Sequence, residues 1–254
     1  MAFAAAVTVM VPLSALSSAP SGADQTYVPL CQGGVDTTPV SGPFHNLTIT
    51  GQDYVANGSS LTVAGNLIIA PGACLDAFST ANVNVGGNIL VGKGSVLALG
   101  CSPGAIGPAT PPCGNPETGV TITTHDTVGG NIVANQPYAM YLTADTIRGN
   151  VVSTGGGPGP SMITFPTKEN TIGGNLVIEG WNGGWIGALR NNVRGNVIFS
   201  YNTSLVDPDS SEVVSNTVGG NLVCFGNVPA VQFGDSGGTP NTVGGHKVGQ
   251  CASV

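Results

Sequence analysis

The chain has 254 residues, of which 40 are glycine and only 7% are charged, and its formal net charge at pH 7 is −7. About a quarter of the residues are charged in an ordinary globular chain, so this is not an average domain. The excess of acidic over basic residues argues against nucleic acid as a partner. The hydrophobic residues, which make up 41% of the chain, argue against intrinsic disorder. What remains is one folded domain with many turns and a continuous apolar interior.

Residues 1–23 have the pattern of a secretion signal. The run from Ala2 to Leu16 is apolar and has the length of the hydrophobic region of such signals, and small residues precede a cleavage site at Asp24. No Lys or Arg precedes the run, so a hydrophobic cap or a first strand is the alternative. The run is too short and too rich in Ala and Ser for a membrane span, and we expect no stable membrane insertion. The chain is therefore predicted to be secreted or held at the cell surface.

A short motif recurs along segment 44–254, whereas segment 24–43 lacks it and is predicted to cap the N-terminal end of the domain. Thr171-Ile172-Gly173-Gly174-Asn175-Leu176-Val177 is a clear copy. With its Asn as position zero, the copies place these residues at zero: Asn46, Asn66, Asn88, Asn131, Asn150, Asn175, Asn196, Asn221 and His246. The steps are 19 to 25 residues, except for one of 43 that we interpret as two turns. A period of about 22 residues is typical of stacked repeats.

The residue types within the motif indicate strands and their orientation. Positions −3 and +1 are aliphatic in nearly every copy, whereas position −4 is Thr or Asn. Strand side chains alternate between faces, so odd positions should face a core and even positions should face solvent or a corner. Val, Ile and Thr around Gly-Gly suit strands and are poor in helices. The sequence predicts an all-β fold, a single right-handed parallel β-helix of about nine to ten turns.

Six cysteines, an even number without a CxxC pair, predict disulfides and an oxidising compartment. Two of them bracket a Pro/Gly loop, and another two lie about one turn apart near the C-terminus, where a disulfide would staple the last turn. The predicted pairs are Cys101 with Cys113, Cys224 with Cys251 and, by elimination, Cys31 with Cys74. Six buried free thiols are the alternative.

The only two tryptophans fall in the Gly-rich stretch Gly180-Trp181-Asn182-Gly183-Gly184-Trp185. Aromatic faces beside amides are what a sugar-binding platform requires. Trp181, Asn182 and Trp185 are therefore the candidate ligand-binding residues, with a carbohydrate or cell-wall polymer as the partner. The alternative is a loop folded over the rod with both indoles packed inside.

A cluster of carboxylates, Asp207, Asp209 and Glu212, is a weak candidate for a hard cation such as calcium. It lacks the Gly-punctuated ligand alternation of a calcium loop, and an Asx/Pro turn in solvent explains it equally well. We therefore predict no metal site and no cofactor.

Another carboxylate pair, Asp126 and Asp145, occupies position −5 of consecutive copies, roughly 5 Å apart if the turns stack. A retaining glycosidase uses a pair at such a spacing. Later copies have Asn at this position, however, which indicates turn chemistry instead. Histidines and basic residues are scattered along the chain: His45, His125, Arg148, Lys168, Arg190 and Arg194. We predict no catalytic residue.

The motif copies also carry a family resemblance. Thr127-Val128-Gly129-Gly130-Asn131-Ile132-Val133, the copy ending at Val177 and the copy from Thr217 to Val223 resemble a group of secreted, largely uncharacterised β-solenoid proteins of actinobacteria. This resemblance covers most of residues 44–251 and implies the fold and export, with no established activity. The chain is more remotely similar to pectate-lyase-like β-helices, but it lacks the acidic or Arg-based motifs of pectin-degrading enzymes.

These features lead to one expected function and two alternatives. We expect a secreted, non-catalytic β-solenoid that acts as a structural, adhesive or binding module at or outside the cell surface. The first alternative is a polysaccharide-active lyase or hydrolase. The second is a self-assembling filament or surface-layer component, since stacked rods with uncapped ends associate end to end.

Overall fold

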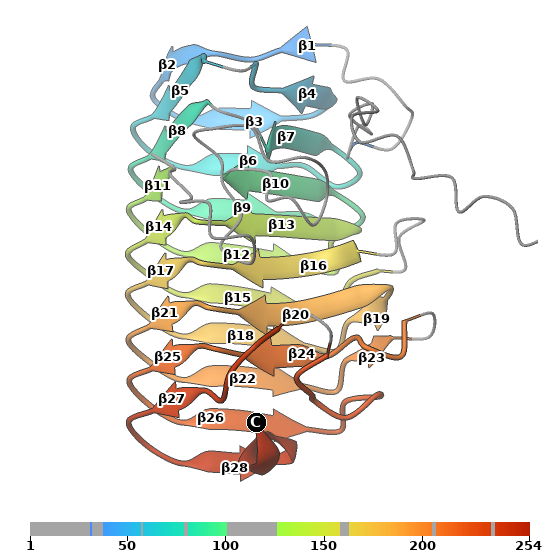
Figure 1. Ribbon diagram of the computed structural model, residues 1–254. Coiled ribbons are helices and arrows are strands. Elements are labelled where there is room, and N and C mark those ends of the chain that lie inside the picture. Colours follow the sequence, from blue (N-terminus) through green and yellow to red (C-terminus); the bar gives the residue numbers. More distant parts are fainter. Residues whose placement is uncertain are drawn as a thin grey trace, which may run out of the picture.

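The structure, a computed structural model, is a three-sided rod of parallel strands (Figure 1). It describes residues 31, 38–56, 58–78, 81–100, 126–157, 163–204, 207–234 and 237–254. Within these residues the one helical element is the 3-10 helix η2 (Gln250–Ser253) at the C-terminus. The prediction of an all-β parallel solenoid with a period of about 22 residues is confirmed.

Three long sheets form the sides of the rod, and the chain visits them in the same order on every turn. Sheet A contains β1 (Thr38–Pro39), β4 (Gln52–Tyr54), β7 (Cys74–Phe78), β10 (Val96–Gly100), β13 (Ala139–Thr143), β16 (Ile163–Lys168), β20 (Trp185–Leu189) and β24 (Glu212–Val214). Sheet B contains β2 (Gly42–Phe44), β5 (Ser60–Val63), β8 (Asn82–Val85), β11 (Thr127–Val128), β14 (Thr146–Ile147), β17 (Thr171–Ile172), β21 (Asn192–Val193), β25 (Thr217–Val218) and β27 (Thr242–Val243).

Sheet C contains β3 (Leu47–Ile49), β6 (Leu67–Ile69), β9 (Ile89–Val91), β12 (Ile132–Asn135), β15 (Val151–Thr154), β18 (Leu176–Glu179), β22 (Val197–Ser200), β26 (Leu222–Phe225) and β28 (Lys247–Gly249). A short fourth sheet pairs β19 (Asn182–Gly183) with β23 (Thr203–Ser204) at the corner between sheets C and A. Every long sheet is parallel because each strand pairs with the strand one turn later.

The number of turns is about eight, which corrects the predicted nine to ten. The step of 43 residues between Asn88 and Asn131 is a single turn, since β8 pairs directly with β11 and β9 with β12. The additional residues lie between β10 and β11, at positions 101–125, outside the described residues. The strands also begin earlier than residue 44, because β1 and β2 already belong to sheets A and B.

The alternation within the motif builds the core as predicted at three of the four odd positions, whereas the glycines at −1, which were also expected to face the core, lie partly exposed at a corner. In sheets B and C the residues at −3, +1 and +3 point inward, and Val63, Leu67 and Ile69 of one copy are completely buried. Aliphatic side chains from all three sheets fill the interior in one continuous cluster. The apolar surface removed from water by these stacked rows, at about 25 cal/mol per Å², is the main source of stability.

The asparagines at position zero lie at the corner between sheets B and C and form a ladder along the rod. The Oδ1 atom of Asn150 accepts the backbone N–H of Asn175 at 2.8 Å and its Nδ2–H at 3.0 Å. The backbone contact repeats from Asn46 to His246, including the step of 43 residues. The question of whether this column faces outward or lines a corner is thus answered: it lines a half-exposed corner.

The ladder explains why a glycine precedes the ladder residue in every copy from Asn66 to His246. A Cβ on Gly174 would lie 2.4 Å from Oδ1 of Asn150, and one on Gly149 would lie 2.5 Å from Oδ1 of Asn131. All the other glycines at position −1 meet the amide of the preceding turn at a similarly short distance: Gly65, Gly87, Gly130, Gly195, Gly220 and Gly245. The Gly-Asn pair is therefore one packing unit shared by two turns.

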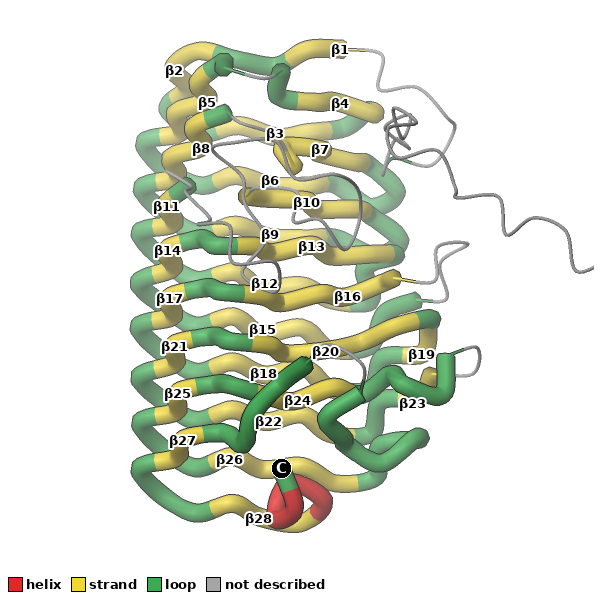
Figure 2. Tube along the Cα trace, viewed as in Figure 1, coloured by secondary structure: helices red, strands yellow, loops and turns green. Residues whose placement is uncertain are grey.

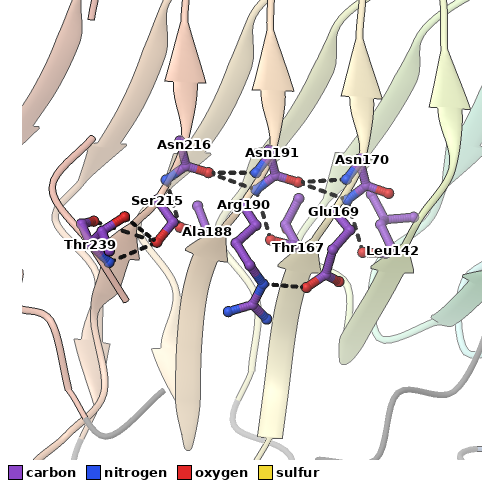
Figure 3. A network of polar contacts seen from close by, with 10 residues as sticks. All are labelled: Leu142, Thr167, Glu169, Asn170, Ala188, Arg190, Asn191, Ser215, Asn216 and Thr239. Atoms are coloured by element: carbon purple, nitrogen blue, oxygen red, sulfur yellow. Dashed lines mark hydrogen bonds and ion pairs between the residues drawn. The ribbon is translucent and has the colours of Figure 1, made fainter. Parts of the chain in front are cut away.

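A second amide ladder, buried, lies at the corner between sheets A and B (Figure 3). Asn191 donates its backbone N–H and Nδ2–H to Oδ1 of Asn216 at 2.9 and 3.0 Å, and also donates Nδ2–H to the Thr167 carbonyl at 2.8 Å. Asn170, Asn216 and Asn241 repeat most of this pattern. The expected local turn chemistry is not what this column shows, because its side chains, at most 5% exposed, bond the neighbouring turns of the rod and not the strand that follows each of them.

A third ladder, at the corner between sheets C and A, was not predicted. Asn202 and Asn227 are buried and donate to the amide oxygen of the following turn, which for Asn227 is Oε1 of Gln250. Asn202 also matches an N-glycosylation acceptor, but its side chain is fully enclosed. All three corners of the C-terminal turns are thus held by amides.

Two of the predicted disulfides are present. Cys31 is bonded to Cys74 of β7, and Cys224 of β26 is bonded to Cys251 of η2. The second disulfide holds η2 over the end of the core, where Cys251 and Val254 are buried. The predicted pair Cys101 and Cys113 lies outside the described residues.

Replacing a glycine at position −1 tests the Gly-Asn unit. We expect Gly174→Ala to destabilise the protein by about 2 kcal/mol, because the new methyl group overlaps the Asn150 amide and the backbone of the preceding turn. Gly51→Ala is the matched control, since its Cβ would meet only one atom, at 3.6 Å. Denaturant unfolding measures both, and an equal loss in the two variants would contradict the expectation.

Comparing the two ladders tests the effect of burial. Asn191→Ala removes the acceptor of the Asn170 backbone N–H and of one Asn170 Nδ2–H, and the side-chain donor to the Thr167 carbonyl, in a dry interior, and we expect a loss of about 3 kcal/mol or more. Asn175→Ala breaks the same kind of contact at a half-exposed corner, where water can replace the amide, and should cost about 1 kcal/mol. Equal free energies of unfolding for the two variants would show that burial does not set the cost.

Candidate functional site

The two tryptophans do not form the exposed platform expected from the sequence. Trp181 is 0% exposed, its indole stacks on Phe165 at a centroid distance of 4.7 Å, and its Nε1–H donates to Ser153 Oγ at 3.0 Å. Trp185 is 8% exposed and donates its Nε1–H to Glu212 Oε1 at 3.0 Å. Only Asn182 of the three candidates is exposed. This corrects the expectation, because neither indole presents a free face for a sugar ring.

The acidic cluster also separates in the structure. Oδ1 of Asp207 accepts the backbone N–H of Asp209 at 3.0 Å, as in an Asx turn. Glu212 is completely buried, and its Oε1 atom accepts the hydrogen bond from the Trp185 indole N–H. In the described part of the chain no group of three His, Cys, Asp or Glu residues is placed to hold a metal ion. The alternative of a turn is therefore the correct one for Asp207 and Asp209.

The basic residues do not converge on a common site. Arg190 forms an ion pair with Glu169 at the corner of sheets A and B (Figure 3). The Lys168 ammonium lies 5.1 Å from the centroid of the Trp185 ring and is buried. His45, Arg148 and Arg194 are exposed, whereas His125 lies outside the described residues.

The carboxyl groups of Asp126 and Asp145 lie at the N-terminal end of the buried ladder. They are 2% and 1% exposed. Asp126 accepts the backbone N–H groups of Val83 and Gly100 at 2.7 and 2.9 Å, and burial raises its pKa to about 6. Neither carboxyl oxygen of Asp145 meets a donor in hydrogen-bonding geometry within the described residues.

The environment of Asp145 favours its protonated form. Burial raises the pKa of this carboxyl well above its usual value, the negative charge of Asp126 raises it further, and the Thr143 backbone offsets part of the effect. Substrate cannot reach either carboxyl without opening the corner. The pair therefore occupies the ladder column, where within the described residues only Asp126 accepts backbone N–H groups, and does not form an accessible dyad.

The outer face of sheet A is covered by other parts of the chain. In β7, β10, β13 and β20 every residue is buried, whereas strands of sheet C alternate between buried and exposed. Outside the main core, two clusters fill this face: Phe78, Ala98 and Tyr141 with Cys31, and Trp185, Leu189 and Val214 with Phe233. Figure 2 shows part of the segment between β26 and β27 lying across β24.

Sheet C presents the opposite kind of surface. At position +2 an aliphatic side chain points outward on eight successive turns, each in register with the next. We call this set the aliphatic row; it consists of Ile68, Leu90, Val133, Val152, Val177, Ile198, Val223 and Val248. Leu90 and Val133 are 41% and 42% exposed. The row is the most regular exposed apolar feature of the described chain.

The exposed aromatic and aliphatic residues outside the row extend the same surface. Phe225 of β26 and Val228 after it are 44% and 58% exposed, and Tyr201, which follows β22, is 65% exposed. Every exposed large hydrophobic residue of the described chain thus lies on sheet C or at its corner with sheet A. Such concentration on one side makes this surface the candidate interaction site of the described chain.

The aliphatic row was not predicted, although its signal is present in the sequence. Position +2 reads Ile, Leu, Val, Val, Val, Ile, Val and Val in successive copies. Outward strand positions of a solvated sheet are usually polar. An aliphatic column at an outward position therefore indicates a candidate contact surface.

Comparisons of the chain with protein-family models, with curated proteins and with solved structures found no match. None of the described elements is a helix with the length and apolarity needed to cross a membrane. The molecule is thus defined by its own geometry: a solenoid with one covered side, one Thr-rich side and one apolar side.

The buried carboxyl pair predicts a pH dependence of stability. The pKa of Asp126 rises from 3.8 to about 6 on folding, so the folded state keeps protons that the unfolded state releases. This contribution is complete below pH 3.8 and is lost as the pH rises to about 6, and Asp145 extends the loss to higher pH. A shift of about two units corresponds to about 3 kcal/mol.

We therefore expect Asp145→Asn to raise the stability at pH 7 and to flatten its decline between pH 4 and 7, because a neutral amide needs no proton and adds an Nδ2–H donor. Denaturant unfolding across this pH range measures the slope. Asp209→Asn, on an exposed turn, is the control and should leave the slope unchanged. A slope that Asp145→Asn does not alter would show that Asp145 is not one of its sources.

Proposed function

We propose that the chain is a secreted, non-catalytic β-solenoid that acts as a structural, adhesive or binding module at or outside the cell surface. The observation that carries this proposal is the division of its three sides. Sheet A, whose outer face contains the buried Glu212 and Asp76, is covered by the chain itself, whereas sheets B and C expose uniform rows. Uniform rows suit an extended, repetitive partner, such as a carbohydrate or cell-wall polymer, or another protein surface.

Export is supported by the chemistry of the cysteines. The disulfides Cys31–Cys74 and Cys224–Cys251 persist in an oxidising compartment and are rare in a reducing one. The apolar run of residues 1–23, followed by small residues, supplies the signal that such export requires. This is also what the resemblance to secreted actinobacterial solenoids implies.

The two alternatives receive less support from the geometry. A lyase or hydrolase needs carboxylates that substrate can reach, and Asp126 and Asp145 are enclosed. Filaments built by end-to-end stacking need open strand edges at both ends. At the C-terminal end, η2 and its disulfide cover the core, and the Lys247 ammonium donates to the Val254 oxygen at 2.6 Å.

Co-sedimentation of the purified chain with insoluble polysaccharides and cell-wall preparations tests this function, with released sugar assayed in the same tubes. We expect retention without release. Thr127→Lys/Thr171→Lys on sheet B and Val133→Lys/Val177→Lys on sheet C alter the same two turns, so comparing them locates the binding side. Release of sugar would overturn the non-catalytic assignment, and absence of retention on every material would contradict a polymer-binding role.

A further inference from the structure

The aliphatic row is a surface without polar selectivity. Its neighbours at position zero are the ladder asparagines, whose Oδ1 atoms already accept two hydrogen bonds each along most of the row. A sugar chain needs hydrogen-bonding groups or aromatic faces to be held in place. An aliphatic row flanked by amides whose oxygens are already occupied offers mainly methyl groups and few acceptors, which favours a partner that is itself apolar.

The electrostatics of this side also distinguish it from the rest of the molecule. The chain carries a net charge of −7, which opposes association of two copies wherever acidic groups would meet. Among the described strands of sheet C, only Glu179 and Lys247 are charged. Lys247 stands at the inward position +1 and bonds to the C-terminal residue. Two sheets C can therefore approach each other with little charge repulsion.

The spacing of the row imposes a further requirement on its partner. Adjacent strands lie about 4.8 Å apart, so the seven steps from Ile68 to Val248 span about 34 Å. Side chains of a partner interdigitate along this length only if they repeat at the same spacing and lie on a comparably flat surface. A second copy of this chain meets both conditions by construction, and a two-fold axis would make the contact self-complementary.

We propose that the aliphatic row is a homodimer interface at which two copies pack sheet C against sheet C, with their rows interdigitated. A face about 34 Å long and about 13 Å wide covers roughly 450 Å². The exposed side chains of Phe225 and Val228 extend it at one end. This is below the ~800 Å² per partner of a standard interface, so the dimer is weak and forms in a concentration-dependent manner. The inference is independent of what the solenoid binds.

Sedimentation velocity of the purified chain, from about 10 μM to about 1 mM, tests the proposal in the affinity range that such an area supports. We expect the weight-average mass to rise with concentration toward twice the monomer mass of 25.2 kDa. Val133→Lys/Val177→Lys places two like charges on each copy at the centre of the row and should keep the protein monomeric at the highest concentration.

Thr127→Lys/Thr171→Lys adds the same charges to sheet B of the same turns and should associate like the wild type. Far-UV circular dichroism and the melting temperature show whether both variants are folded, as expected for outward positions that are exposed or, at Val177, half-buried. A wild type that stays monomeric at 1 mM, or association that is lost equally in both variants, would overturn the proposal. These outcomes do not depend on polymer retention, so failure of the dimer and failure of the proposed function are distinguishable.

Discussion

The contact between the amide of one turn and the glycine of the next is the interaction on which this solenoid depends. The Asn side chain accepts hydrogen bonds from the following turn and occupies the space that a Cβ there would need. It satisfies backbone donors at a corner, where a three-sheet rod would otherwise leave them unpaired. In the buried ladders at the other corners the direction is reversed, since each Oδ1 accepts hydrogen bonds from the preceding turn. Apolar rows drive collapse of the interior, but the amides keep successive turns in register, because each Oδ1 holds a neighbouring turn at hydrogen-bond distance.

The three sides of the rod have distinct roles although they share one backbone geometry. Sheet A has a buried outer face: Tyr141 packs in a cluster with Cys31, and Leu189 packs in a cluster with Phe233 of the segment between β26 and β27. Sheet B exposes mainly Thr, which suits a solvated strand surface. Sheet C exposes aliphatic side chains that an isolated monomer gains nothing by displaying. The covered side is sheet A, and the exposed rows lie on the other two sides, sheets B and C.

The sequence allowed the strand pattern, the inward positions and two disulfides to be predicted because all of them follow from local alternation and spacing. The turn count failed because the pairing of β8 with β11 is nonlocal, and a long insertion at a corner has the same spacing as a missing repeat. The prediction that Trp181 is exposed failed for a related reason. Its stacking partner Phe165 comes from another turn, and nothing in a Gly-rich stretch reveals such stacking. The outward row of sheet C could have been found, since it occupies a fixed position of the motif. The partner of this row could not have been predicted, since a partner leaves no periodic signal in the sequence.

The uninterrupted ladder across the 43-residue step has a consequence for how such a molecule can change. Its length in space is set by the number of turns, each advancing by about 4.8 Å, whereas its length in sequence is free to vary at the corners. Asn88 and Asn131 make the same amide contact as asparagines 19 residues apart. The length of the rod therefore increases in fixed steps, and each step corresponds to one hydrogen-bonded contact of the ladder. Gene duplication of whole turns would lengthen the rod by fixed increments, and new segments can be inserted at a corner without displacing any contact of the ladder.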